Sequence, residues 1–203
     1  MRQPTLTGYK SIMRRILRDA AILSVLSAFL AGAGVQSAAQ TYRAADIEAE
    51  EAHAETLIAQ LIEEQRERNA PDAKPLSFDA QLGKIAHLRS DSMAHGSPFS
   101  HEDAEGNFIA ADKVHEVFGP YGAVGENIFM EMSSSHAFDP DAFARRAVRG
   151  WMQSEGHRAN ILSPRYDRAG VGVVFNGTIA YATQVFWGPP DPPVRVPAPA
   201  RRR

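Results

Sequence analysis

The chain has 203 residues, 44% of them hydrophobic and 23% charged, which is the composition of one globular domain with a well-buried core. Its formal net charge is -2, and the basic groups near the N-terminus leave an acidic body, which excludes the electrostatic footprint of a nucleic-acid-binding protein. The sequence contains no cysteine, which excludes disulfides, thiolate metal sites and cysteine nucleophiles.

The first residues have the pattern of an export signal. A basic stretch ends at Arg18, an apolar run without charges extends from Ala20 to Val35, and small residues follow at Ser37 and Ala39, as signal-peptide cleavage requires. The apolar run has about 16 residues, whereas a helix that spans a bilayer needs roughly 20. We therefore predict a signal peptide over residues 1–39, export to the periplasm or the extracellular space, and no stable membrane insertion after cleavage. An uncleaved membrane anchor and a buried core helix are the alternatives.

The body begins with two predicted amphipathic helices. The first spans residues 46–69, and the second starts after Asp79, a suitable N-cap, and stops before the breaker Gly96-Ser-Pro98. In both, apolar residues recur at spacings of three and four, which is typical of a helix with one buried face. The predicted buried positions are Leu57, Ile58, Leu61, Ile62, Leu82, Ile85, Ala86, Leu88 and Met93.

The middle of the chain predicts loops and two more helices. Residues 97–106 have loop composition, residues 107–118 predict a short helix, and residues 133–140 are a polar linker. A third long helix is expected over residues 141–162, with Trp151 among its core residues.

A β-hairpin and a proline-rich tail end the sequence. β-branched runs at residues 170–175 and 179–187 flank Asn176-Gly177, a pair that favours a type I′ turn. Residues 188–203 contain six of the 13 prolines and end in three arginines, so they predict a disordered or polyproline tail that is solvated. Helices that alternate with a few strands, without a regular βαβ repeat, indicate an α+β fold with a mixed sheet flanked by helices.

Five segments together resemble a known family. They are Phe99-Ser100-His101, Gly125-Glu126-Asn127-Ile128, the stretch from Trp151 to Leu162 (WMQSEGHRANIL), Gly170-Val-Gly172-Val, and the stretch from Tyr181 to Trp187 (YATQVFW). In this order they resemble the signature segments of the bacterial CAP, or SCP-like, family of extracellular domains. The resemblance runs from about residue 55 to Trp187. It implies a CAP domain over residues 40–187, with a three-layer α-β-α sandwich and a cleft on one face.

The resemblance also implies a site. In animal and plant relatives the cleft typically holds two histidines and two glutamates that can bind a divalent metal. By motif, His101 matches the first histidine and Glu126 the first glutamate, whereas Ser154 and Tyr181 stand where the animal pattern has the second glutamate and the second histidine. His157, in the bacterial-type Gly-His-Arg segment, is the candidate that fills the cleft instead.

The resemblance therefore implies His101, Glu126 and His157 as metal ligands, with zinc as the cofactor. It implies Ser154, Tyr181 and Gln184 as ligand-binding residues.

The chemistry of these groups leaves alternatives open. Two histidines and a glutamate suffice as ligands of a catalytic-type zinc with one position for water, and without metal they can share hydrogen bonds. A Ser154–His157 pair suggests a hydrolase, but the sequence has no G-x-S-x-G elbow and no acid placed to orient the imidazole. No H-E-x-x-H motif occurs either, so we assign no catalytic residue.

The resemblance implies a secreted, non-enzymatic binding module for a lipid or a protein, as a monomer by default. A metal-dependent hydrolase, with Glu126 as base at the same cleft, is the alternative, and a purely structural role in the envelope is a third.

Overall fold

The computed structural model describes residues 43–134 and 137–190, so the predicted signal peptide and most of the predicted tail lie outside the described residues. After a helix over residues 43–69, eight elements follow in chain order. They are β1 (Ser77–Phe78), α2 (Ala80–Ala94), α3 (Ile109–Phe118), β2 (Ala123–Met132), α4 (Pro140–Gln153), α5 (Glu155–Leu162), β3 (Arg168–Asn176) and β4 (Ile179–Gly188).

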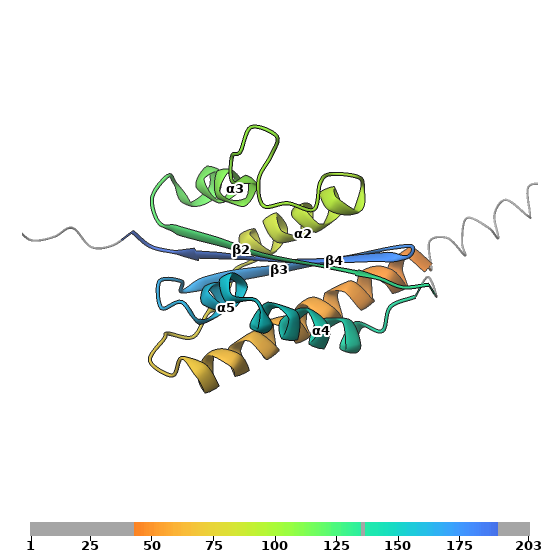
Figure 1. Ribbon diagram of the computed structural model, residues 1–203, viewed down its shortest axis with the longest axis horizontal. Helices are drawn as coiled ribbons and strands as arrows, with labels where there is room; N and C mark the ends of the chain where they lie inside the picture. The colour runs from red at the N-terminus through yellow and green to blue at the C-terminus, as the bar shows by residue number, and fades with distance from the viewer. Residues whose placement is uncertain (1–42, 135–136, 191–203) are drawn as a thin grey trace, which may run out of the picture. The chain divides into compact units, whose positions relative to one another are not determined.

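The strands form one mixed sheet between two layers of helices. The strand order is β1-β3-β4-β2, with β1 parallel to β3 and the other pairs antiparallel. Figure 1 shows α2 and α3 on one side of this sheet and α4 and α5 on the other. Residues 49–69 pack on the side of α4, since Ile58 and Ile62 share a core cluster with Phe143. The predicted α+β three-layer α-β-α sandwich is therefore confirmed.

The edge strand β2 positions the site. Side chains alternate between the two faces of a strand, so Glu126 and Ile128 face α2 while Asn127 and Phe129 face α4 and α5. The contacts agree with this alternation, because Ile128 clusters with Met93 of α2 whereas Phe129 packs against Phe143 of α4.

Several predicted elements are confirmed and two need correction. The first two helices and the Asp79 N-cap are found as expected, and Trp151 is buried in the core. The prediction that Leu88 is buried was wrong, because this side chain of α2 is 55% exposed. The predicted long helix over residues 141–162 was wrong in one respect, because it breaks at Ser154, which has an extended backbone (φ -93°, ψ 125°) and separates α4 from α5.

The hairpin turn lies one residue later than expected. Asn176 pairs with Ile179, so the two turn residues are Gly177 and Thr178, and Gly177 supplies the positive φ (61°).

In the described part of the chain, none of the helices combines the length and the apolar character needed to cross a membrane.

Candidate functional site: a histidine cleft at the edge of the sheet

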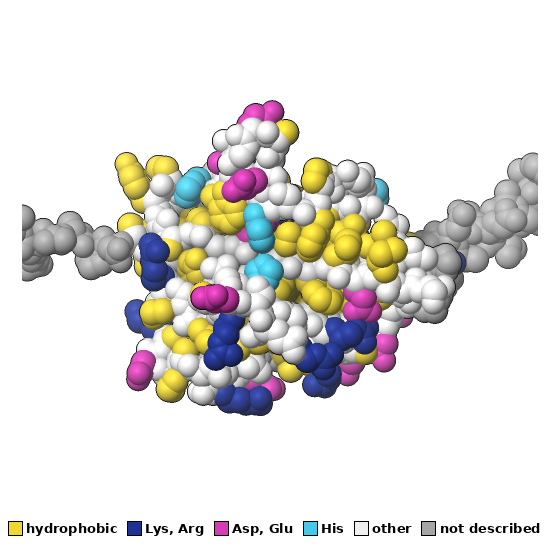
Figure 2. All heavy atoms as spheres, viewed as in Figure 1, with side chains coloured by type: hydrophobic (Ala, Val, Ile, Leu, Met, Phe, Trp, Pro, Cys, Tyr) yellow, Lys and Arg dark blue, Asp and Glu magenta, His cyan; other side chains and the backbone are white. Residues whose placement is uncertain are grey.

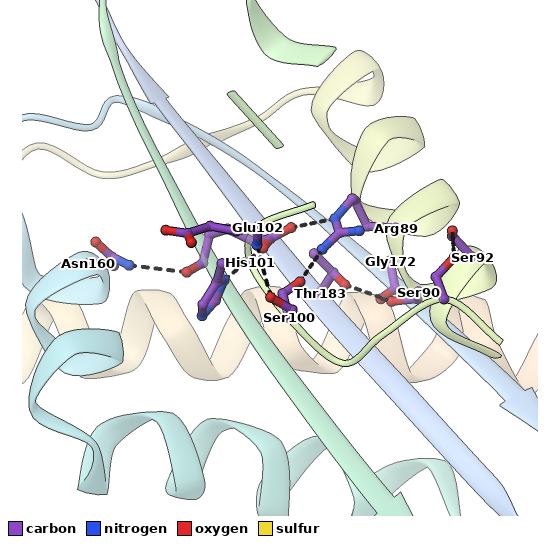
Figure 3. Close-up of polar contacts among 11 residues, drawn as sticks. Arg89, Ser90, Ser92, Ser100, His101, Glu102, Asn160, Gly172 and Thr183 are labelled. Carbon is purple, nitrogen blue, oxygen red and sulfur yellow. Dashed lines mark hydrogen bonds and ion pairs between the residues drawn. The ribbon is translucent and has the colours of Figure 1, made fainter. Parts of the chain in front are cut away.

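Glu126 is the centre of a buried polar cluster. Its side chain has 0% exposure, its Oε1 accepts a hydrogen bond from Arg89 Nε at 2.8 Å, and its Oε2 accepts one from His101 Nδ1 at 2.7 Å. Figure 3 shows Arg89 reaching this cluster from α2 and His101 from the loop that follows. A buried carboxylate is costly unless it is paired, and here a guanidinium and an imidazole use both of its oxygens.

Arg89 carries no motif and was not predicted as a site residue. It is buried on α2, and besides Glu126 it donates to the carbonyl oxygen of Ser100 at 2.7 Å, which holds the loop before His101 in place. The signal was present in the sequence, because Arg89 lies four residues from both Ile85 and Met93, within the apolar stripe. An arginine at such a position needs a buried acceptor, and Glu126 is that acceptor.

His157 lies opposite His101. It is the third residue of α5, and its ring centroid is 5.8 Å from that of His101 in an edge-on arrangement. Two amides fix α5 against β2: Asn127 Nδ2 donates to the carbonyl oxygen of His157 at 3.2 Å, and Asn160 Nδ2 donates to Asn127 Oδ1 at 3.0 Å. These hydrogen bonds fix His157 relative to β2, and the hydrogen bond to Glu126 fixes His101 relative to the same strand. β2 therefore sets the distance between the two imidazoles.

The segment after Trp151 also closes the outer edge of β2. The carbonyl oxygens of Val124, Glu126 and Ile128, at alternate positions of this edge strand, point away from β4. They accept hydrogen bonds from Tyr166 Oη (3.3 Å), Asn160 Nδ2 (3.2 Å) and Trp151 Nε1 (3.0 Å), respectively. An edge strand whose acceptors are already used is a poor template for pairing with another chain, so these side chains protect the edge beside the cleft.

The cleft between the two histidines has a volume of about 420 Å³. Its lining residues come from the loop after α2, from β2 and from the start of α5: His101, Glu102, Phe108, Val124, Gly125, Glu126, Ser154, Gly156, His157 and Asn160. Figure 2 shows a pair of histidine side chains at the centre of this face, with hydrophobic side chains beside them.

The predicted site residues divide into two groups. His101, Glu126, His157 and Ser154 meet in the cleft. Ser154 and His157 were expected within one helix over residues 141–162, but Ser154 is extended and lies outside α5.

Tyr181 and Gln184 do not line the cleft. Gln184 is fully buried on the opposite face of the sheet, where its Oε1 accepts a hydrogen bond from Asn127 Nδ2 at 3.4 Å. A ligand in the cleft therefore cannot reach its side chain. Tyr181 lies on the same face as Glu126, but it pairs with Met130 further along β2 and contacts Phe99, with 6.3 Å between ring centroids.

The donor set for a metal is small. Because the Glu126 carboxylate can only accept, Nδ1 of His101 carries the proton, which leaves Nε2 of His101 and the His157 ring as available donors. Within residues 43–134 and 137–190, no group of three or more histidine, cysteine, aspartate or glutamate side chains is placed to hold a metal ion. The arrangement fits a catalytic zinc with three protein ligands poorly. Glu126 accepts the Nδ1–H of His101, which is the role of a carboxylate that orients a histidine and is not itself a metal ligand.

Burial lowers the pKa of His157, and the charge of His101 lowers it further, while Glu126 acts in the opposite direction. The folded chain therefore favours neutral His157, and the unfolded chain takes up its proton first as the pH falls through about 6.5. We expect this residue to reduce the free energy of unfolding progressively below that pH. Urea denaturation at pH 7.5 and at pH 5.5 measures the loss, which becomes smaller in His157→Gln. An equal loss in the variant contradicts the assignment.

Comparisons with known proteins place these features in one family. Residues 62–187 match the CAP family, described as the cysteine-rich secretory protein family. The Bacillus subtilis protein YkwD, which is itself uncharacterised, is 34% identical over 123 residues, covering 60% of this chain and 43% of YkwD. The chain therefore spans less than half the length of this relative.

Two solved structures have the same fold. An extracellular protein from Bacillus anthracis that contains an SCP domain aligns with a TM-score of 0.53 and 28% identity, over 68% of this chain and 41% of that one. An outer surface protein from Borrelia burgdorferi aligns with a TM-score of 0.55 over 66% of this chain and 91% of that one, at 16% identity. With the family match over more than half of its length, this chain belongs to the CAP family of cysteine-rich secretory protein domains.

Proposed function

We propose that this chain is an exported CAP-domain binding module whose histidine cleft holds the polar end of an amphipathic ligand. The observation that carries the proposal is the engagement of Glu126. Both of its oxygens are used by Arg89 and His101, and its side chain is fully buried. A general base must be free to accept a proton from water within hydrogen-bonding distance, and Glu126 is not free. The cleft therefore supports binding better than hydrolysis.

The surface beside the cleft gives the chemistry of the ligand. We call Phe99, Met130 and Met132 the apolar strip; they are 46%, 39% and 70% exposed. Met130 and Met132 continue the face of β2 that carries Glu126, and Phe99 precedes His101 by two residues. Exposed apolar side chains that adjoin a polar pocket are typical of a binding surface. A long-chain lipid, with its head group hydrogen-bonded to the imidazoles, fits both parts.

Export is supported by the sequence at the N-terminus and by a relative. Residues 1–39 have the charge and apolar pattern of a signal peptide, and the similar Bacillus anthracis protein is described as extracellular. We propose that the CAP domain acts outside the cytoplasm, in the periplasm or beyond the cell.

Binding of cis-parinaric acid, a fluorescent long-chain fatty acid, tests the ligand. We expect the full-length chain to bind it and the double variant Met130→Glu/Met132→Glu to bind about tenfold more weakly or worse, because each methionine loses its apolar contact. Leu88→Glu is the matched control, since Leu88 is an exposed apolar residue on α2 outside the strip, and it should bind as the unmodified chain does. Absence of binding, or an equal loss in the control, contradicts the proposal.

A metal-dependent hydrolase at the same cleft would have to bind zinc and turn over a substrate. The binding module proposed here is expected to do neither. Zinc titration calorimetry on the full-length chain should give a Kd above about 1 μM, because among the described residues the cleft offers two imidazoles and no third metal ligand. Turnover of p-nitrophenyl acetate should not exceed that of free imidazole at the concentration of the chain's seven histidines. Tighter zinc binding that is lost in both His101→Ala and Glu126→Ala, or turnover that is lost in His157→Ala, establishes the hydrolase instead.

A further inference from the structure

A second groove lies at the other edge of the sheet. It has a volume of about 770 Å³ and lies between the helix that ends at residue 69, the start of α2, and β3. We call it the acidic groove, because five of its lining residues are carboxylates: Glu55, Glu63, Glu64, Glu67 and Asp79. It shares no residue with the histidine cleft, so the two surfaces can be tested separately.

The floor of the acidic groove is apolar. Phe78, Ala80 and Val171 line it together with Ala59, and the ring of Phe78 is partly exposed although it belongs to a strand. An apolar floor with a charged rim suits an extended segment that carries both apolar and charged side chains.

The rim has an excess of negative charge. The described residues that line the groove include no lysine and no arginine. Glu67 makes no hydrogen bond or ion pair with any other described residue. Burial raises the pKa of Glu63, the backbone N–H of Leu76 and the charge of Arg66 oppose this rise, and the charge of Glu67 adds to it. Basic side chains outside the lining contact the other four carboxylates: His87 lies 3.4 Å from Glu55, Arg66 3.9 Å from Glu63, Arg68 2.8 Å from Glu64 and Arg168 3.5 Å from Asp79. Among the described residues, Glu67 is therefore the rim carboxylate that has no basic partner, and it carries the excess charge.

The sequence after β4 has the complementary composition. Residues 191–203 (DPPVRVPAPARRR) contain four arginines and one acid, and Val194 and Val196 flank Arg195. Arginine is the residue best suited to pair with carboxylates, and valines suit the apolar floor.

The end of β4 is close enough for this segment to reach the groove. Trp187 pairs with Arg168 of β3, and Arg168 pairs with Ser77 of β1, one residue before Phe78. Two strand spacings amount to about 10 Å. Residues 191–203 span up to about 45 Å when extended. Figure 1 shows β4 ending at the same end of the sheet as the loop after the first helix.

We propose that the acidic groove is the docking site of the arginine-rich segment 191–203 of the same chain, with its valines on the Phe78 floor and its arginines on the carboxylate rim.

Spin labelling tests this directly, because the chain has no cysteine of its own. A nitroxide on Ala200→Cys in the ¹⁵N-labelled full-length chain should broaden the amide signals of Gln60 and Gly83, which line the groove. The broadening should disappear in Glu64→Lys/Glu67→Lys and in about 1 M NaCl, where the Debye length falls to about 3 Å. It should persist in Glu116→Lys/Glu155→Lys, which reverses two exposed carboxylates outside the groove.

Three results overturn the proposal. The first is no broadening at Gln60 and Gly83, and the second is broadening that survives the groove variant. The third is broadening in a mixture of two samples, a ¹⁵N-labelled chain that carries no nitroxide and an unlabelled chain that carries one. Broadening in this mixture means that a second copy of the chain supplies the segment. Since all four substituted glutamates are exposed, the variants are expected to fold, and circular dichroism confirms this before the measurement.

Discussion

Replacing Arg89 with methionine should lower the free energy of unfolding by about 3–5 kcal/mol, because removing one partner of a buried ion pair leaves the other charge uncompensated. Arg89 and Glu126 are both buried, and Glu126 retains only His101 when the guanidinium is removed. The carbonyl oxygen of Ser100 also loses its donor, so the loop that carries His101 is released as well. Urea denaturation of the full-length chain measures the loss.

Two further variants separate the uncompensated charge from a simple loss of packing. In Arg89→Met/Glu126→Gln the charge is removed with its partner, so much of the lost stability should return. Arg68→Met removes an exposed arginine from its pair with Glu64 and should cost no more than about 1 kcal/mol. A loss below about 1 kcal/mol in Arg89→Met, or no recovery in the double variant, contradicts the role of Arg89 as the compensating charge for Glu126.

The helices and the hairpin were predictable because their signals are local. Apolar spacing and the Asp79 cap determine α2, and β-branched runs around a turn determine β3 and β4. The break at Ser154 was not predicted, because no proline lies between Trp151 and Ile161 and both of these residues were expected in the core of one helix. It arises from tertiary contacts, because Asn127 and Asn160 hold α5 against β2.

β2 itself is a harder case. It carries Glu126 and Asn127, two buried polar residues, in place of the apolar alternation that predicts a strand. Only the partners explain them, and these come from α2, from the loop after it and from α5. A polar residue buried by distant segments leaves no periodic trace in the sequence.

The candidate site could be predicted only in part for the same reason. The resemblance brought His101, Glu126 and His157 to one cleft, and the structure places them there. The resemblance did not show that both oxygens of Glu126 are already engaged, because one of them pairs with Arg89, which belongs to no signature segment. Gln184 belongs to a signature segment, yet it faces the opposite side of the sheet from the cleft. Successive residues of a strand point to opposite faces of the sheet, so a signature segment in a strand contains residues that face the cleft and residues that do not.

Replacing Gly172 with alanine should lower the free energy of unfolding by about 3 kcal/mol or more, although it adds a single methyl group to the core. A Cβ at this position would lie 2.0 Å from the backbone nitrogen of His87 and 2.3 Å from the carbonyl carbon of Ala86. These are backbone atoms of α2, so no side chain can rotate to make room. The helix must move away from β3, and Arg89 on the same helix then moves away from Glu126. Urea denaturation gives the stability, and the ¹⁵N chemical shift of Glu126 reports the displacement.

Gly156→Ala is the matched control, since a Cβ there meets no atom within 4 Å. Gly156 lies in α5, where alanine is the better helix former, so this variant should keep the stability or raise it by up to about 1 kcal/mol. A Gly172→Ala protein as stable as Gly156→Ala would mean that α2 can shift on the sheet without cost. The close contact of α2 with β3 would then not be what aligns Arg89 with Glu126, and the hydrogen bond from Arg89 to the carbonyl oxygen of Ser100 would have to do so alone.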